Sequence, residues 1–183
     1  MQIKETHLKG CFIIEPIVFK DERGYFFESF NQAKFKELTG ENIHFVQDNE
    51  SMSSRGVLRG LHLQTRRHQQ AKLVRVIKGA VLDVCVDLRK NSISFGKHFS
   101  VKLSEENKKQ LFVPRGFAHG FVVLEDDTIF SYKCDNYYNK ASESGIIYND
   151  TILNIDWQIP ENQLILSERD TKLPTFKNFN FEN

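Results

Sequence analysis

Short apolar runs, each ended by a turn residue, recur along most of the chain. Residues 71–77 alternate apolar and polar side chains, Lys78 and Gly79 follow, and residues 80–87 alternate again. Many short strands with turn signals between them are typical of sandwiches, jelly rolls and barrels. The pattern therefore predicts an all-β fold, with a hairpin over residues 71–88.

Further strands and one helix complete the expected elements. Asn31 can cap a helix over residues 32–38, and Gly40 can end it. Phe35 and Leu38 are expected to share the apolar face of this helix, and short helical turns are expected after Ser104 and near the C-terminus. The remaining strands are predicted at residues 11–14, 24–30, 43–47, 98–103, 110–113, 120–124 and 128–134.

Length and charge narrow the class of protein. A chain of 183 residues without a Pro/Gly/Ser-rich linker is expected to form a single domain, residues 1–183. Its 25 basic and 24 acidic residues leave a formal charge of +1, which argues against nucleic-acid or membrane-surface binding. The N-terminus has no apolar signal segment and no run reaches transmembrane length, so a cytoplasmic location is expected.

The densest polar segment is residues 54–64, with Lys72 shortly after it. If residues 58–64 are extended, positions 58, 60, 62 and 64 share one face. Gly60 would then expose backbone beside His62 and leave room for a ligand. His62 is a candidate general base, although a single histidine in an apolar strand is more often a hydrogen-bonded core residue.

A second segment contains Pro114, Gly116 and His119. The spacing Pro-x-Gly-x-x-His resembles the second motif of cupin barrels, where the histidine commonly binds a metal. It leaves two interpretations open: a metal site, or a metal-free pocket at the same position.

The first cupin motif favours the metal-free pocket. Metal-binding cupins carry His-x-His followed shortly by Glu, whereas here Leu63 and Gln64 follow His62 and no Glu does. Lys72 stands where the acid is expected, and its cation would repel a divalent metal. We therefore expect no metal and no cofactor, and a buried lysine that can stabilise an oxyanion.

Two further segments carry weaker signals. Tyr132 lies inside the predicted strand 128–134, where a tyrosine is usually a core residue with its hydroxyl hydrogen-bonded. Asp170, near the C-terminus, is an acid that could pair with a histidine.

Together and in this order, these segments resemble the dTDP-4-dehydrorhamnose 3,5-epimerase family. Leu-Arg-Gly-Leu-His at residues 58–62, combined with Pro-Arg-Gly-Phe-Ala-His-Gly at residues 114–120, is highly specific. The other matching stretches are residues 23–28, 47–49, 72–76, Gly79, 87–89, 132–133 and 166–170.

The resemblance implies a cupin-type jelly-roll β-barrel with a few short peripheral helices. It also implies a homodimer that exchanges N-terminal strands. The expected activity is epimerisation of dTDP-4-dehydro-6-deoxy-D-glucose at C3 and C5, giving dTDP-4-dehydro-L-rhamnose. A ketone at C4 acidifies the protons on both flanking carbons, so a base can remove one and an acid on the opposite face can return it.

By the same resemblance, His62 is the base and Asp170 holds its ring. Tyr132 is the opposing acid, Lys72 stabilises the C4 enolate, and His119 lies beside the sugar.

The nucleotide site follows from the same family pattern. Arg23 and Arg59 match arginines that bind the diphosphate. Arg23 and Glu28 are expected to come from the partner subunit, and Arg169 stands where family members often have lysine. Tyr138 is expected to stack on the base. The other expected contacts are Glu28, Gln47, Asp48, Asn49 and Glu143.

Three alternatives stay open. The chain could epimerise C3 only, or act on a related nucleotide 4-keto sugar, because only the edges of the pocket would differ. A metal-dependent cupin is opposed by the absent His-x-His. A non-catalytic sugar-binding cupin is opposed by the presence of both His62 and Tyr132, since binding alone needs no base opposite an acid.

Overall fold

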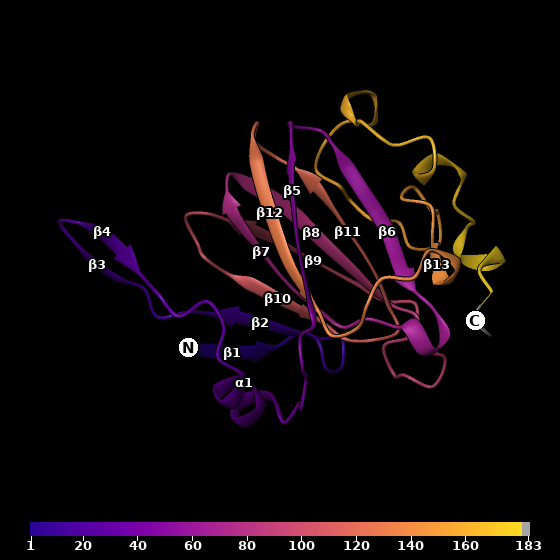
Figure 1. The fold of residues 1–183 in the computed structure, drawn as a ribbon. Helices are drawn as coiled ribbons and strands as arrows, with labels where there is room; N and C mark the ends of the chain where they lie inside the picture. Colours follow the sequence, from indigo (N-terminus) through magenta and orange to yellow (C-terminus); the bar gives the residue numbers. More distant parts are fainter. Residues whose placement is uncertain (181–183) are drawn as a thin grey trace.

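The structure is a computed structural model that describes residues 1–180. Two β-sheets pack face to face, and a small third sheet extends away from them (Figure 1). This arrangement is the expected cupin-type jelly roll. The largest sheet has the order β1 (Gln2–Glu5), β2 (Phe12–Glu15), β10 (Gln110–Val113), β7 (Lys72–Lys78), β12 (Thr128–Cys134) and β5 (Gln47–Ser53).

The second sheet supplies the opposite wall. Its order is β13 (Glu143–Gly145), β6 (Leu58–Gln64), β11 (Phe117–Val123), β8 (Ala80–Asp87) and β9 (His98–Ser104). The third sheet is the hairpin of β3 (Phe19–Asp21) and β4 (Gly24–Phe26). The other elements are α1 (Gln32–Thr39) and short 3-10 turns at Arg66–His68, Lys140–Ser142, Glu161–Gln163, Asp170–Lys172 and Phe176–Asn178.

Apolar side chains from both large sheets fill the space between them. Val74 and Phe130 from the first sheet meet Val81, Cys85 and Phe121 from the second, and each is at most 5% exposed. Burying such side chains stabilises the fold by roughly 1.5–3 kcal/mol apiece. This core holds the two walls at a fixed separation.

The C-terminal segment covers the outer face of the second sheet. Trp157 and Phe179 pack against Leu61 and Val84 from that sheet. Ile165 pairs with the start of β6, because its N–H donates to Gly56 O (2.9 Å) and its carbonyl accepts from Leu58 N (3.0 Å). The segment is thereby tied alongside β6.

The predicted hairpin over residues 71–88 is wrong. Both strands exist, but β7 pairs with β10 and β12 while β8 pairs with β9 and β11. At Gly79 (φ 77°) the chain passes from one sheet to the other. A Cβ at Gly79 would lie 2.3 Å from Thr128 Oγ1, so glycine is required at this crossing.

Two other strand predictions need correction. β4 ends at Phe26 and does not continue to residue 30. No strand covers residues 43–46; instead β5 begins at Gln47 and runs through polar residues to Ser53. β5 is an edge strand, whose outward face tolerates polar side chains, so apolar alternation does not reveal it. The segment after Ser104 forms a turn and no helix.

The predicted helix is confirmed as α1. Asn31 Oδ1 accepts from Lys34 N at 3.1 Å, and Gly40 ends the helix in the left-handed region (φ 76°). Phe35 is 1% exposed, but Leu38 is 48% exposed, so the two do not share a buried face. Within residues 1–180, no helix is long and apolar enough to span a membrane.

Phe35 is expected to hold α1 on the barrel, because its ring lies 5.0 Å from that of Phe112 and packs against Phe30 and Phe45. Replacing Phe35 by alanine should lower the free energy of unfolding by about 3–5 kcal/mol. Leu38→Ala, on the same helix, should cost less than ~1 kcal/mol. Urea denaturation measures both, and equal losses would contradict this packing.

Candidate active site

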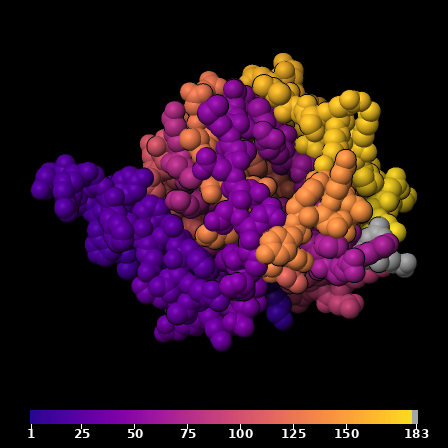
Figure 2. All heavy atoms as spheres, in the orientation of Figure 1, coloured from indigo at the N-terminus to yellow at the C-terminus, as the bar shows by residue number. Residues whose placement is uncertain are grey.

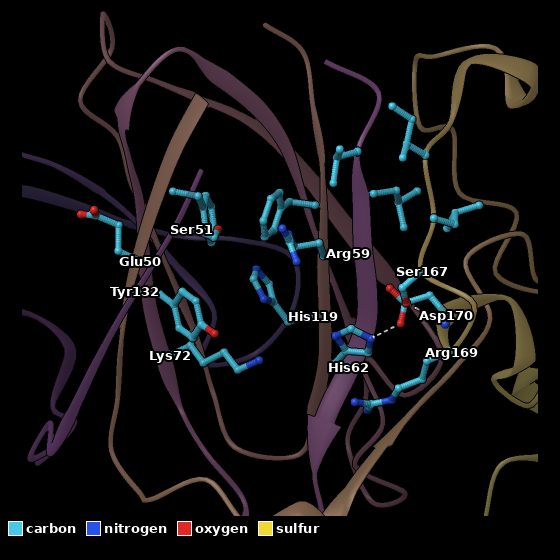
Figure 3. A pocket seen from close by; sticks show the side chains of 16 residues that line it. Glu50, Ser51, Arg59, His62, Lys72, His119, Tyr132, Ser167, Arg169 and Asp170 are labelled. Atoms are coloured by element: carbon cyan, nitrogen blue, oxygen red, sulfur yellow. Dashed lines mark hydrogen bonds and ion pairs between the residues drawn. The ribbon is translucent and has the colours of Figure 1, made fainter. Parts of the chain in front are cut away.

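A cavity of about 560 Å³ lies between the two large sheets. Strands β5, β6, β7, β11 and β12 line it together with the segment of residues 165–170 (Figure 3). Its polar lining consists of Glu50, Ser51, Arg59, His62, Lys72, His119, Tyr132, Ser167, Arg169 and Asp170. We call it the main cavity.

His62 and Asp170 form a hydrogen-bonded pair on one wall of the main cavity. His62 Nε2 lies 2.6 Å from Asp170 Oδ1. Asp170 also accepts from Gly60 N at 3.5 Å, and its own N–H donates to Ser167 Oγ at 3.1 Å. Burial by itself would raise the pKa of Asp170, but the bonds from His62 and Gly60 lower it overall. Because Nε2 is occupied, Nδ1 is the ring atom left to accept a proton from a ligand.

An irregularity in β6 lets Arg59 and His62 both line the main cavity. In a regular strand, residues three apart point to opposite faces. Here the register against β11 shifts between His119, which faces His62, and Phe121, which faces Arg59. The expected shared face of residues 58, 60, 62 and 64 is therefore wrong.

Gly60 serves close backbone packing and does not make room for a ligand. A Cβ at Gly60 would lie 2.5 Å from the Cα of Gly120 and 3.0 Å from His119 O. The residue also has φ 135°, which L side chains rarely adopt. The motif glycine is needed because β6 and β11 approach closely at this point.

Tyr132 comes from the wall opposite His62, as Figure 3 shows. It lies on β12, and its ring packs against Phe130 at 6.0 Å between centroids. Burial raises the pKa of Tyr132 above its usual value of 10.0. The phenol therefore keeps its proton near neutral pH, as a proton donor requires.

Lys72 lies between these two walls. Its Nζ is 5.8 Å from the centre of the Tyr132 ring. Burial lowers the pKa of Lys72, while electrostatic interactions with Cys134, Asp83 and Glu143 oppose that change. A cation held in a partly dry cavity interacts strongly with any negative charge that forms beside it.

His119 faces His62 across the β6–β11 ladder and carries its own carboxylate partner. Its Nε2 lies 3.0 Å from both Oδ1 and Oδ2 of Asp83, which is fully buried. Asp83 was not predicted as a site residue. The available signal was a single acid among the apolar residues Val81–Val86.

A second cavity of about 330 Å³ adjoins the first and shares His62, Lys72 and Tyr132 with it. Glu143 organises its edge, because its Oε2 accepts from Tyr138 Oη at 2.7 Å and pairs with Arg169 Nη1 at 2.7 Å. The remaining lining residues are Gln47, Asn49, Leu63, Gln64 and Gln70. Of the residues that the sequence assigned to nucleotide binding, this adjoining cavity therefore collects Gln47, Asn49, Tyr138 and Glu143.

Three of the expected contact residues lie elsewhere. Asp48 points away from both cavities and pairs with Lys133 at 3.0 Å. Glu28 pairs with Lys34 at 2.9 Å beside α1. Arg23 bonds to Asp21 on the exposed β3–β4 hairpin, which projects from the barrel (Figures 1 and 2).

Apolar side chains complete the main cavity and were not predicted. Phe121 and Phe130 stack with ring centres 4.0 Å apart beside His119. Val57, Leu58, Ile165 and Leu166 line the cavity near Arg59. In the described part of the chain, no three His, Cys, Asp or Glu side chains converge as metal ligands would.

Comparison with known proteins gives the family. The sequence profile of dTDP-4-dehydrorhamnose 3,5-epimerase matches residues 5–178. The dTDP-4-dehydrorhamnose 3,5-epimerase of Escherichia coli K12 is 52% identical over 176 residues, which cover 96% of this chain and 94% of that protein. The crystal structure of the enzyme of that name from Elizabethkingia anophelis is 62% identical, with a TM-score of 0.94 and 97% of each chain covered.

A second solved structure carries a ligand. It is a dTDP-6-deoxy-D-glucose-3,5-epimerase from Legionella pneumophila in complex with dTDP-4-keto-L-rhamnose, and it is 46% identical to this chain. The TM-score is 0.95, and the match covers 99% of this chain and 95% of that one. The profile, the identities and the fold agree, and the chain belongs to the dTDP-4-dehydrorhamnose 3,5-epimerase family.

Proposed function

We propose that this protein converts dTDP-4-dehydro-6-deoxy-D-glucose into dTDP-4-dehydro-L-rhamnose by inverting C3 and C5. One observation carries the proposal: His62, supported by Asp170, and Tyr132 enter the main cavity from opposite walls, with Lys72 between them. An epimerase needs a base on one face of the reacting carbon and an acid on the other. A sugar-binding protein would need neither.

In the proposed reaction, Nδ1 of His62 removes the proton from the carbon beside the C4 ketone. Asp170 fixes the imidazole and stabilises its cationic form, as the acid of a His–Asp pair does. The electrons move onto the ketone oxygen, where the ammonium of Lys72 stabilises the enolate. A single donor of this kind contributes about 3–4 kcal/mol. Tyr132 then protonates the carbon from the other face, and the configuration inverts.

The adjoining cavity suits the nucleotide. Tyr138 offers a ring that can stack on a base, while Gln47 and Asn49 offer amides for its polar edges. Arg59, whose Nη2 donates to Ser53 Oγ at 3.1 Å, supplies a guanidinium for the diphosphate. Arg169 can supply a second guanidinium to the diphosphate if its ion pair with Glu143 opens.

The N-terminal hairpin supports a proposed homodimer. Phe19, Tyr25 and Phe26 are 62%, 56% and 70% exposed on a two-stranded sheet. Such a sheet is not stable alone, and apolar groups on it need a covering surface. We propose that β3–β4 and the segment that follows it cross to a second copy and supply Arg23 and Glu28 to its nucleotide site.

We also propose that the chain forms a single domain and that the protein is cytoplasmic. Strands β8 and β11 contribute to the buried clusters on both of their faces, which supports one cooperative unit. Cys11, Cys85 and Cys134 are buried, free thiols, which suits a reducing compartment.

Proton NMR in D₂O tests the proposed reaction on both carbons. Incubation with dTDP-4-keto-6-deoxyglucose should replace the protons at C3 and C5 with deuterium. Exchange at C3 alone would instead support the C3-only epimerase, and no exchange with retained binding would support a sugar-binding protein.

His62→Ala is expected to slow deuterium exchange at both carbons by about 10²–10⁴-fold, because the proposed base is removed. Binding of dTDP, measured by calorimetry, should change little, since Gln47, Asn49 and Tyr138, the groups proposed to hold the base, remain in place. His44→Ala, an exposed histidine, is the matched control. Near-normal turnover in His62→Ala would show that another group removes the proton.

Tyr132→Phe is expected to separate proton removal from inversion. His62 remains, so exchange from the original face should continue, while formation of the inverted product should fall at least tenfold. Quantifying deuterated substrate against inverted product in one NMR time course measures this ratio. Full epimerisation in the variant would remove Tyr132 from its proposed role.

Phe26→Asp should disturb the proposed dimer, because it places a charge in the apolar surface that a second copy would cover. We expect monomer in light scattering and loss of most activity, since Arg23 would no longer reach the partner's site. Ile93→Asp, at an isolated residue that is 87% exposed, should alter neither property. A fully active Phe26→Asp monomer would contradict the exchange of strands.

A further inference from the structure

Asp83 is a buried carboxylate beside the main cavity. It has no role in the proton transfer proposed for His62, Tyr132 and Lys72. It lies in the middle of β8, every residue of which is buried, and its own exposure is 0%. Burying an ionised carboxylate costs several kcal/mol unless partners compensate it. Asp83 is therefore expected to have specific partners in the core.

The first partner of Asp83 is His119. Both carboxylate oxygens lie 3.0 Å from Nε2, so this nitrogen must be the one that carries a proton and donates. The His119 ring is also stacked near Phe130, with centres 6.3 Å apart. The ring thus has a fixed tautomer and a fixed orientation in the cavity wall.

The second partner is Lys72, with which Asp83 interacts electrostatically and without a hydrogen bond. Among residues 1–180, no carboxylate lies within ion-pair distance of its ammonium, although burial lowers its pKa. Cys134 and, next to it in size, Asp83 and Glu143 raise that pKa again. Asp83 lies directly behind His119, which lines the same cavity as Lys72. A lysine that must be cationic to stabilise an enolate depends on such a neighbour.

We infer that Asp83 is a positioning residue, which orients His119 and keeps Lys72 protonated in the main cavity. The inference rests on the role proposed above for Lys72. A bare negative charge would oppose the enolate, so Asp83 favours the reaction only through the two groups that it holds.

Other titratable groups face this cluster from the neighbouring strands. They are Cys85 on β8, Tyr132 and Cys134 on β12, Glu143 on β13, and the His62–Asp170 pair. Burial raises the pKa of Cys134 to about 11 and also raises the pKa values of Cys85 and Tyr132. None of these three adds charge near neutral pH. Glu143 is neutralised by Arg169 at 2.7 Å, which leaves Asp83 as the main opposing charge for Lys72.

The pH dependence of kcat tests the inference. Asp83→Asn keeps the shape but removes the charge, so the pKa of Lys72 should fall. Activity is lost as pH rises through that pKa, and the alkaline limb of the kcat profile should therefore move to lower pH. We expect kcat at neutral pH to fall about 10–100-fold, with dTDP affinity within about twofold of the wild type. Asp83→Glu should restore the limb to its wild-type position, because it restores the charge.

Asp87→Asn is the matched control. Asp87 lies on the same strand, is also fully buried, and bonds to Arg89, Ser92 and Ser94 away from the cavity. Its loss should lower stability and leave the alkaline limb in place. A limb that stays in place in Asp83→Asn, or moves equally in Asp87→Asn, would overturn the inference.

Nitrogen NMR of the wild-type protein gives a test that needs no folded variant. With ¹⁵N-labelled histidine, His119 Nε2 should remain protonated across the pH range of activity. An unprotonated Nε2 would overturn the inference. Deuterium exchange by the wild-type protein tests the proposed epimerase function separately from the role of Asp83. If the wild type exchanges substrate protons but the alkaline limb does not shift in Asp83→Asn, or Nε2 of His119 is not protonated, only the role of Asp83 is contradicted.

Discussion

The hydrogen bond between His62 and Asp170 joins a strand of the second sheet to the C-terminal segment that packs on the outer face of that sheet. His62 lies on β6, while Asp170 follows a C-terminal segment that is tied to β6 through Ile165. Buried Trp157 and the other side chains under that segment hold it in place. The 2.6 Å contact therefore depends on the packing of the outer face of the second sheet. Proton abstraction in this account depends on that packing too.

Burial of the cavity sets the properties of its other polar groups. It raises the pKa of Tyr132, which favours the protonated phenol, and it lowers the pKa of Lys72, which opposes the ammonium. The first effect suits a proton donor without further help. The second needs compensation, and Asp83 lies where it can provide it. Burial in one cavity thus supplies an acid directly and a cation only through a buried partner.

The sequence predicted which side chains line the cavities better than how the strands pair. Alternation identified residues 72–78 and 80–87 as strands, but it records only which face is buried and says nothing of the partner strand. The crossing at Gly79 was therefore missed. The position of β5 was predicted wrongly because this edge strand is made of polar residues and lacks apolar alternation. The role of Gly60 was predicted wrongly because the sequence of one strand does not reveal that Gly120 of a neighbouring strand approaches it closely. His62, Lys72, His119 and Tyr132 were found through their motif spacing, whereas Asp83 has no motif of its own.

A crystal structure with a non-reactive dTDP-linked 6-deoxy sugar tests the central arrangement most directly. The account predicts that C3 and C5 lie between Nδ1 of His62 and Oη of Tyr132, about 3–3.5 Å from one or both groups. The oxygen at C4 should point toward Nζ of Lys72. A sugar with both His62 and Tyr132 on the same face of its ring would contradict the account, since no proton could then leave one face and return to the other.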